Sequence, residues 1–204
     1  MIRNVLLDWS GTLADDLGSV LEATNKIFAE YGRDPLDLEQ FRSHFRLPFS
    51  EFYAELLPEA TLEGLEELYE RFFHGMNDRI DLLPGAREFL DFCRGTGRRT
   101  FLLSSIKTSH FTIQAERNGV AGYFEVAYTE VMDKRSKIRE ILKTHQLDLR
   151  ETMFVGDMVH DIETAKHGGV LDVAVLSGFD RLEKLAAAHP TIIASDIGGV
   201  QRLL

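Results

Sequence analysis

The chain has little of several residue types, and each shortage excludes a class of protein. Its single cysteine, Cys93, excludes an internal disulfide and a zinc site built from several cysteines. Cys93 lies in an apolar helical pattern, so we interpret it as a buried core thiol. No apolar run approaches the roughly 20 residues that cross a bilayer, and no basic region precedes a long apolar one at the start. We therefore expect a cytoplasmic protein without a membrane partner.

Positive charge is also scarce. The 204 residues carry a formal net charge of -10. Residues 14–82 hold 16 acidic and 6 basic residues, whereas the remainder holds 17 of each. A nucleic-acid partner is not expected, because contacts with phosphates need a basic face. We interpret most of the excess acids as solvated helix faces.

From residue 83 onward, patterns typical of strands alternate with patterns typical of helices. Strands are expected at 100–104, 123–128, 152–155, 170–176 and 191–194, and helices at 84–95, 109–118, 135–145, 159–167 and 181–188. A first strand ends at Asp8. This alternation predicts an α/β fold: a Rossmann-like parallel sheet with helices on both faces.

Residues 15–82 contain no strand pattern, and helices are expected at 17–28, 38–45, 50–57 and 62–77. We therefore predict two domains, a core of residues 1–14 and 83–204 and an all-helical cap of residues 15–82. In parallel sheets, ligands bind beyond the carboxyl ends of the strands. An insert directly after the first strand would lie over that edge as a lid.

Carboxylates follow two of the expected strands. Asp8 ends the first strand, Asp157 follows the strand at 152–155, and Asp161 lies one helical turn after Asp157. A buried carboxylate is unfavourable unless something binds it, and three clustered acids repel one another unless a cation lies among them. Oxygen ligands in this number suit Mg²⁺, which keeps several waters and leaves room for a phosphate.

Four short segments resemble the motifs of the haloacid dehalogenase superfamily, in order and in spacing. They are Asp-Trp-Ser-Gly-Thr at 8–12, Ser104 at a strand end, a lysine near 134, and Gly-Asp-Met-Val-His-Asp at 156–161. The helical insert resembles the α-helical (C1-type) cap of the branch that includes phosphoglycolate phosphatases and phosphonatases. Residues 83–90 and 175–179 are also similar to that branch.

The resemblance implies a role for each motif. Asp8 would be the nucleophile that forms an aspartyl-phosphate. A lysine would screen charge between Asp8 and the phosphate; Lys134 and Lys137 both open the same helix, and Lys134 is preferred because its 23-residue lead to Asp157 fits the family. The implied phosphate-binding residues are Gly11, Thr12, Ser104, Ser105 and Lys134. The implied Mg²⁺ ligands are Asp8, the backbone carbonyl of Ser10, Asp157 and Asp161.

Ser10 departs from the pattern of the family's phosphatases, which usually have a second aspartate there. That acid protonates the leaving alcohol and then activates water, and serine does neither at neutral pH. The loss is expected to slow catalysis by about 10²- to 10⁴-fold. Asp15 or Asp16 could replace the acid, but both are expected to cap the first helix of the insert.

Three functions therefore stay open: a slow or specialised phosphohydrolase, a phosphate-binding or regulatory protein with little turnover, and a phosphonatase. A phosphonatase uses a cap lysine as a Schiff base, and Lys26 is the only lysine in the insert. A haloalkanoate dehalogenase needs no metal, which the retained acids argue against. Lys26, Arg42 and Arg46 are the basic candidates for the far end of a substrate, which the acidic lid suggests is a small phosphorylated molecule.

Overall fold

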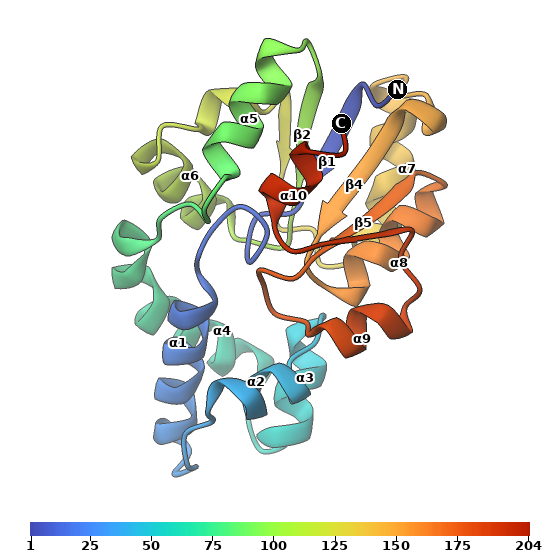
Figure 1. The fold of residues 1–204 in the computed structure, drawn as a ribbon. Coiled ribbons are helices and arrows are strands. Elements are labelled where there is room, and N and C mark those ends of the chain that lie inside the picture. Colours follow the sequence, from blue (N-terminus) through green and yellow to red (C-terminus); the bar gives the residue numbers. More distant parts are fainter.

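A six-stranded parallel sheet forms the centre of the protein in the computed structural model, which describes residues 1–204 (Figure 1). Its strand order is β3-β2-β1-β4-β5-β6. The strands are β1 (Asn4–Leu7), β2 (Arg99–Leu103), β3 (Val126–Tyr128), β4 (Thr152–Gly156), β5 (Leu171–Val175) and β6 (Ile192–Ala194). The chain order reverses between β1 and β4, so the carboxyl ends of these neighbours flank the switch point where ligands bind in such sheets. The predicted fold class is confirmed.

Alternate residues of each central strand enter different hydrophobic cores. Val5 and Leu7 of β1 pack on one face of the sheet, and Leu6 packs on the other. The first core also contains Phe89 and Ile197, from α5 (Ala86–Gly95) and α10 (Ile197–Gln201), and residues of α6 (Thr108–Arg117). The second core contains residues of α7 (Lys134–Thr144) and α8 (Val159–Gly168). Because both faces are covered, β1 and β4 are buried along their length, and their carboxyl ends are fixed.

Between residues 15 and 82 the chain forms helices and connecting segments but no strand. The helices are α1 (Leu17–Glu30), α2 (Leu38–His44), α3 (Phe49–Leu56), α4 (Leu62–Phe73) and a 3₁₀ helix at His74–Arg79. Figure 1 shows these helices beyond the end of the sheet toward which the β4 arrow points. No helix is long and apolar enough to cross a membrane.

The two segments that connect this helical insert to the sheet run side by side. Ala14 and Leu82 form an isolated antiparallel bridge. The Leu83 amide donates to the Leu13 carbonyl at 2.8 Å, and the Asp15 amide donates to the Asp81 carbonyl at 2.9 Å. Backbone pairing therefore fixes the direction in which the chain leaves the end of β1 and enters α1.

Three elements differ from the sequence expectation. The helix expected at 62–77 ends at Phe73 and continues as the 3₁₀ helix, where Gly75 weakens the α pattern. The strand expected at 123–128 begins only at Val126, because residues 121–123 form a 3₁₀ turn. Helix α10, with two glycines in five residues, was not predicted. The remaining short helices are a 3₁₀ helix at Leu149–Glu151 and α9, which spans Leu182–Ala187.

Candidate active site

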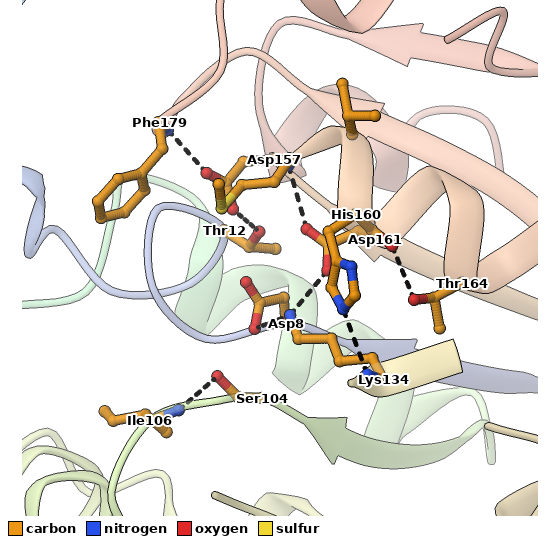
Figure 2. A network of polar contacts seen from close by, with 12 residues as sticks. Asp8, Thr12, Ser104, Ile106, Lys134, Asp157, His160, Asp161, Thr164 and Phe179 are labelled. Carbon is orange, nitrogen blue, oxygen red and sulfur yellow. Dashed lines mark hydrogen bonds and ion pairs between the residues drawn. The ribbon is translucent and has the colours of Figure 1, made fainter. Parts of the chain in front are cut away.

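Asp8, Lys134 and Asp161 form a buried chain of ion pairs at the carboxyl edge of the sheet (Figure 2). Asp8 directly follows β1, Lys134 is the first residue of α7, and Asp161 lies in the first turn of α8. Lys134 Nζ lies 2.8 Å from Asp8 Oδ1 and 2.7 Å from Asp161 Oδ1. Side-chain exposure is 1% for Lys134 and Asp161 and 6% for Asp8, so solvent does not screen these charges.

The structure distinguishes the two candidate lysines by position. Lys137 lies one turn further along α7, is partly exposed, and pairs with Glu140 at 2.7 Å. The Lys134 backbone amide donates to His160 Nε2 at 3.2 Å. Burial and the nearby Lys134 charge lower the pKa of His160 to about 4, which keeps the ring neutral and able to accept this bond. His160 thereby orients the start of α7, and Lys134 with it.

Asp157, at the end of β4, is held by two other segments of the chain. Thr12 Oγ1 donates to Asp157 Oδ1 at 3.0 Å, and the Phe179 amide donates to Asp157 Oδ2 at 2.7 Å (Figure 2). Gly11 packs against the same carboxylate with a φ of +72°, and a Cβ there would lie 2.6 Å from Asp157 Oδ2. Only glycine combines that backbone conformation with so close an approach.

The acids of this site carry more negative charge than the protein neutralises. One oxygen from each of Asp8, Asp157 and Asp161 lies within 4.8 Å of the others, and Lys134 is the one cation that pairs with them. Burial, reinforced by repulsion from Asp8 and Asp161, raises the pKa of Asp157 well above its ordinary value. Burial also raises the pKa of Asp8, against the opposing attraction of Lys134. A divalent cation with oxygen ligands would relieve this repulsion, so the residues present fit Mg²⁺.

A cavity of about 520 Å³ lies between this edge of the sheet and the helical insert. Asp8, Ser10 and Asp16 all line it. Asp16 occupies the N-cap position of α1, yet its side chain makes no capping hydrogen bond. The residue is 1% exposed, and its Oδ1 has no hydrogen-bond partner. This corrects the expectation that Asp16 caps the helix: its carboxyl group faces the cavity instead.

Burial raises the pKa of Asp16 to about 7, although a hydrogen bond from the Ser10 side chain opposes the shift. The charge of Asp8 adds to the increase. A carboxyl group with such a pKa is available in both protonation states near neutral pH. The sequence signal for Asp16, an acid immediately before a helix, is the same as that of an ordinary cap. Sequence reasoning therefore named Asp16 as a possible replacement for the acid but favoured a capping role.

The residues expected to bind phosphate differ in whether they line the cavity. Ser105 lines the cavity. Ser104 is buried just after β2, where its hydroxyl accepts a 3.4 Å hydrogen bond from the Ile106 amide. Gly11 and Thr12 do not line the cavity. Their amides donate to the carbonyls of Ala14 and Trp9, and the Thr12 hydroxyl donates to Asp157. The donors of Gly11 and Thr12 thus have partners within the protein, and phosphate binding by these two residues stays a prediction.

The basic residues expected to contact substrate also lie elsewhere. Lys26, Arg42 and Arg46 do not line the cavity. Lys26 pairs with Glu22 on α1, and Arg46 pairs with acids of α3, its closest contact being 2.6 Å from Glu55. Arg42 Nη2 donates to the Gly178 carbonyl at 2.7 Å. All three side chains have partners within the protein, which are acids of the insert for Lys26 and Arg46 and a backbone carbonyl for Arg42. Substrate contacts from these residues stay a prediction.

Comparison with known proteins agrees with these motifs. A family model described as haloacid dehalogenase-like hydrolase matches residues 5–175. A phosphoglycolate phosphatase from Synechococcus elongatus is 28% identical over 196 residues, which cover 93% of this chain and 91% of that protein. A 5'-nucleotidase from Pseudomonas aeruginosa is 25% identical over 211 residues, covering 98% of this chain and 95% of that protein.

Among solved structures, a haloacid dehalogenase-like hydrolase from Streptococcus pneumoniae has the same fold, with a TM-score of 0.85 at 22% identity. The match covers 99% of this chain and 98% of that one. The resemblance to the phosphoglycolate phosphatase-like branch is thus confirmed. Because the family model spans most of the sequence and its motifs meet at one edge of the sheet, the chain belongs to the haloacid dehalogenase-like hydrolase family.

Proposed function

We propose that the protein is a Mg²⁺-dependent phosphohydrolase that forms an aspartyl-phosphate on Asp8. The convergence of Asp8, Asp157 and Asp161 around Lys134, next to a cavity that Asp8 lines, carries the proposal. The names of the curated relatives support phosphomonoester chemistry.

The Mg²⁺ ligands would be Asp8, Asp157, the Ser10 backbone carbonyl and Asp161, the last directly or through water. When bound, the ion neutralises the carboxylates and draws electron density from a phosphoryl oxygen. The buried and mutually repelling acids support this assignment, because they present oxygen donors without enough protein cations to balance them.

In the first step, an Asp8 carboxylate oxygen attacks phosphorus, and the bond from phosphorus to the ester oxygen breaks. Lys134 stabilises negative charge between the nucleophile and the phosphoryl group, as a point charge held in place by Asp161. The hydroxyls of Ser104 and Ser105 would bind phosphoryl oxygens. In the second step, water attacks the aspartyl-phosphate, the bond from phosphorus to Asp8 breaks, and inorganic phosphate leaves.

Asp16 replaces the missing acid at position 10. Its carboxyl group gives a proton to the departing alcohol oxygen in the first step and takes one from the attacking water in the second. The support is positional: Asp16 lines the same cavity as Asp8 and Ser10, is shielded from solvent, and has an oxygen without a partner. Ser10 keeps its carbonyl for the metal, and the residue lines the same cavity as Asp16.

The structure gives less support to a phosphonatase, because the cavity contains no lysine from the helical insert. Lys26, the only candidate, points to Glu22 at 2.7 Å. A phosphate-binding protein without turnover would use the same core residues, so activity has to separate it from an enzyme.

The test measures phosphate release from alkyl, aryl and acyl phosphates, with Mg²⁺ or with a chelator. We expect the wild type to turn over only with Mg²⁺ and Asp8→Asn to release no phosphate, while circular dichroism shows that the variant is folded. Asp16→Asn should slow both steps on alkyl phosphates, with a loss of about 10²-fold or more in phosphate release. On acyl phosphates, whose leaving group needs no proton, it should slow hydrolysis of the aspartyl-phosphate but have little effect on its formation. An inactive wild type that becomes active as Ser10→Asp would contradict the proposal and favour a binding protein.

A further inference from the structure

The cavity wall above Asp8 is mainly apolar. Twelve of the 21 residues that line the cavity are hydrophobic. Most of them come from the helical insert, which contributes residues of α1, α3 and α4 and the segment before α3. The aromatic members are Phe45, Phe49, Tyr53, Tyr69, Phe73 and Phe179.

The charged groups around this wall are nearly all acidic. Besides Asp8 and Asp16, the cavity is lined by Glu66 of α4 and Glu130, which follows β3. Lys107 is the only lysine or arginine that lines it. The Lys107 ammonium already pairs with Glu70 at 2.8 Å, and Nε2 of His110, which also lines the cavity, lies 3.2 Å from the same carboxylate. Burial lowers the pKa of His110, so the cavity offers no free cation beyond the proposed metal.

Size and charge together restrict the group that the cavity accepts. A volume of about 520 Å³ lies in the range of sites that enclose drug-sized molecules, well above the need of a two-carbon acid. A substrate carboxylate would lose its water among aromatic rings and would have to displace Glu70 from Lys107. An uncharged apolar group would bury its surface against the apolar cavity wall and would leave the ion pair between Lys107 and Glu70 intact.

We propose that the cavity binds the alcohol portion of a phosphate monoester in which that portion is apolar and uncharged. This inference rests on the proposed phosphohydrolase function and names its substrate class. The proposed substrate class differs from phosphoglycolate, the substrate in the name of several relatives, because phosphoglycolate carries a carboxylate on the alcohol side.

The test is a binding measurement that does not depend on turnover. Benzylphosphonate and phosphonoacetate resemble the two substrate classes and cannot be hydrolysed as esters. Isothermal titration of the full chain with Mg²⁺ should give at least about tenfold tighter binding of benzylphosphonate. Equal or tighter binding of phosphonoacetate, or failure of benzylphosphonate to bind, would overturn the inference.

Two variants identify the surface involved. Phe49→Asp places a charge on the apolar wall and should weaken benzylphosphonate binding by about tenfold or more, whereas Leu62→Asp, at an exposed position of the same insert, should not. Glu70→Gln frees Lys107 and should strengthen phosphonoacetate binding several-fold without changing benzylphosphonate binding. Equal effects of Phe49→Asp and Leu62→Asp would contradict the assigned wall.

Phosphate release from benzyl phosphate separates the two proposals. If benzylphosphonate binds as expected but no phosphomonoester is hydrolysed, the phosphohydrolase function fails while the binding preference stands. If phosphoglycolate is hydrolysed and bound better than benzyl phosphate, the function stands and the substrate class is wrong.

Discussion

Arg42 of α2 donates a 2.7 Å hydrogen bond to the carbonyl oxygen of Gly178. The next residue, Phe179, donates its amide to Asp157, and the Phe179 ring lies 5.1 Å from that of Phe45 in the insert. One loop of the sheet domain therefore contacts both the helical insert and a proposed metal ligand. We therefore expect the position of the insert over Asp8 to depend on the position of Asp157 through this loop.

Arg42→Met should lower kcat/KM by roughly 5- to 30-fold. A hydrogen bond from a charged donor contributes about 1–2 kcal/mol, here to the contact that holds the insert against the loop containing Gly178. Arg46→Met is the matched control. Arg46 pairs only within the insert, so its loss should leave kcat/KM nearly unchanged. Steady-state phosphate release measures both, and equal losses in the two variants would contradict a specific role for the Arg42 contact.

Lys134→Met should abolish phosphate release and lower the free energy of unfolding by about 3–5 kcal/mol, since it leaves buried carboxylates without their cation. Lys137→Met removes only a partly exposed pair with Glu140 and should change stability by less than about 0.5 kcal/mol. Urea unfolding of both variants decides between the two lysines. A larger loss of stability in Lys137→Met than in Lys134→Met would show that Lys134 is not the motif lysine.

Asp16→Asn should stabilise the metal-free protein more at pH 8 than at pH 5. The Asp16 pKa is about 7 in the folded protein and near 3.8 in the unfolded chain. Protonation of Asp16 therefore favours the folded state fully below about pH 4, and this contribution is lost as the pH rises through 7. The difference between the two pH values should be about 2.5 kcal/mol, measured by urea unfolding with a chelator. Asp15→Asn, at an exposed neighbouring position, should show no such difference.

Cys93 should not react with Ellman's reagent in the folded protein at pH 8. The residue is fully buried, and burial raises the pKa of its thiol to about 12, so little thiolate is present. Addition of urea should make reaction complete as the chain unfolds. Rapid labelling of the native protein would show that α5 is not packed against the sheet as described.

Local sequence patterns were sufficient for the sheet and for the positions of Asp8, Asp157 and Asp161. Each of these acids directly follows a strand or opens a helix, and burial of both faces of the sheet makes such strands easy to recognise. Helix α10 was missed because two glycines in five residues remove the helical signal.

The cavity wall could not be read from the sequence, because it depends on pairing between distant segments. Arg42 and Arg46 look like substrate-binding residues until their partners, Gly178 and Glu55, are known. Asp16 looks like a helix cap until the bridge between Ala14 and Leu82 fixes the direction of the chain. The contact between Arg42 and Gly178 joins residues 136 positions apart, which leaves no local pattern.

The covalent state of Asp8 during turnover tests the account most directly. With p-nitrophenyl phosphate, whose leaving group needs no proton, loss of the Asp16 base should slow hydrolysis of the aspartyl-phosphate more than its formation. Acid quenching of Asp16→Asn during turnover, followed by mass spectrometry of peptides, should show phosphate on Asp8 at a higher level than in the wild type. Phosphate on another residue, or continued phosphate release with Asp8 never modified, would contradict the account.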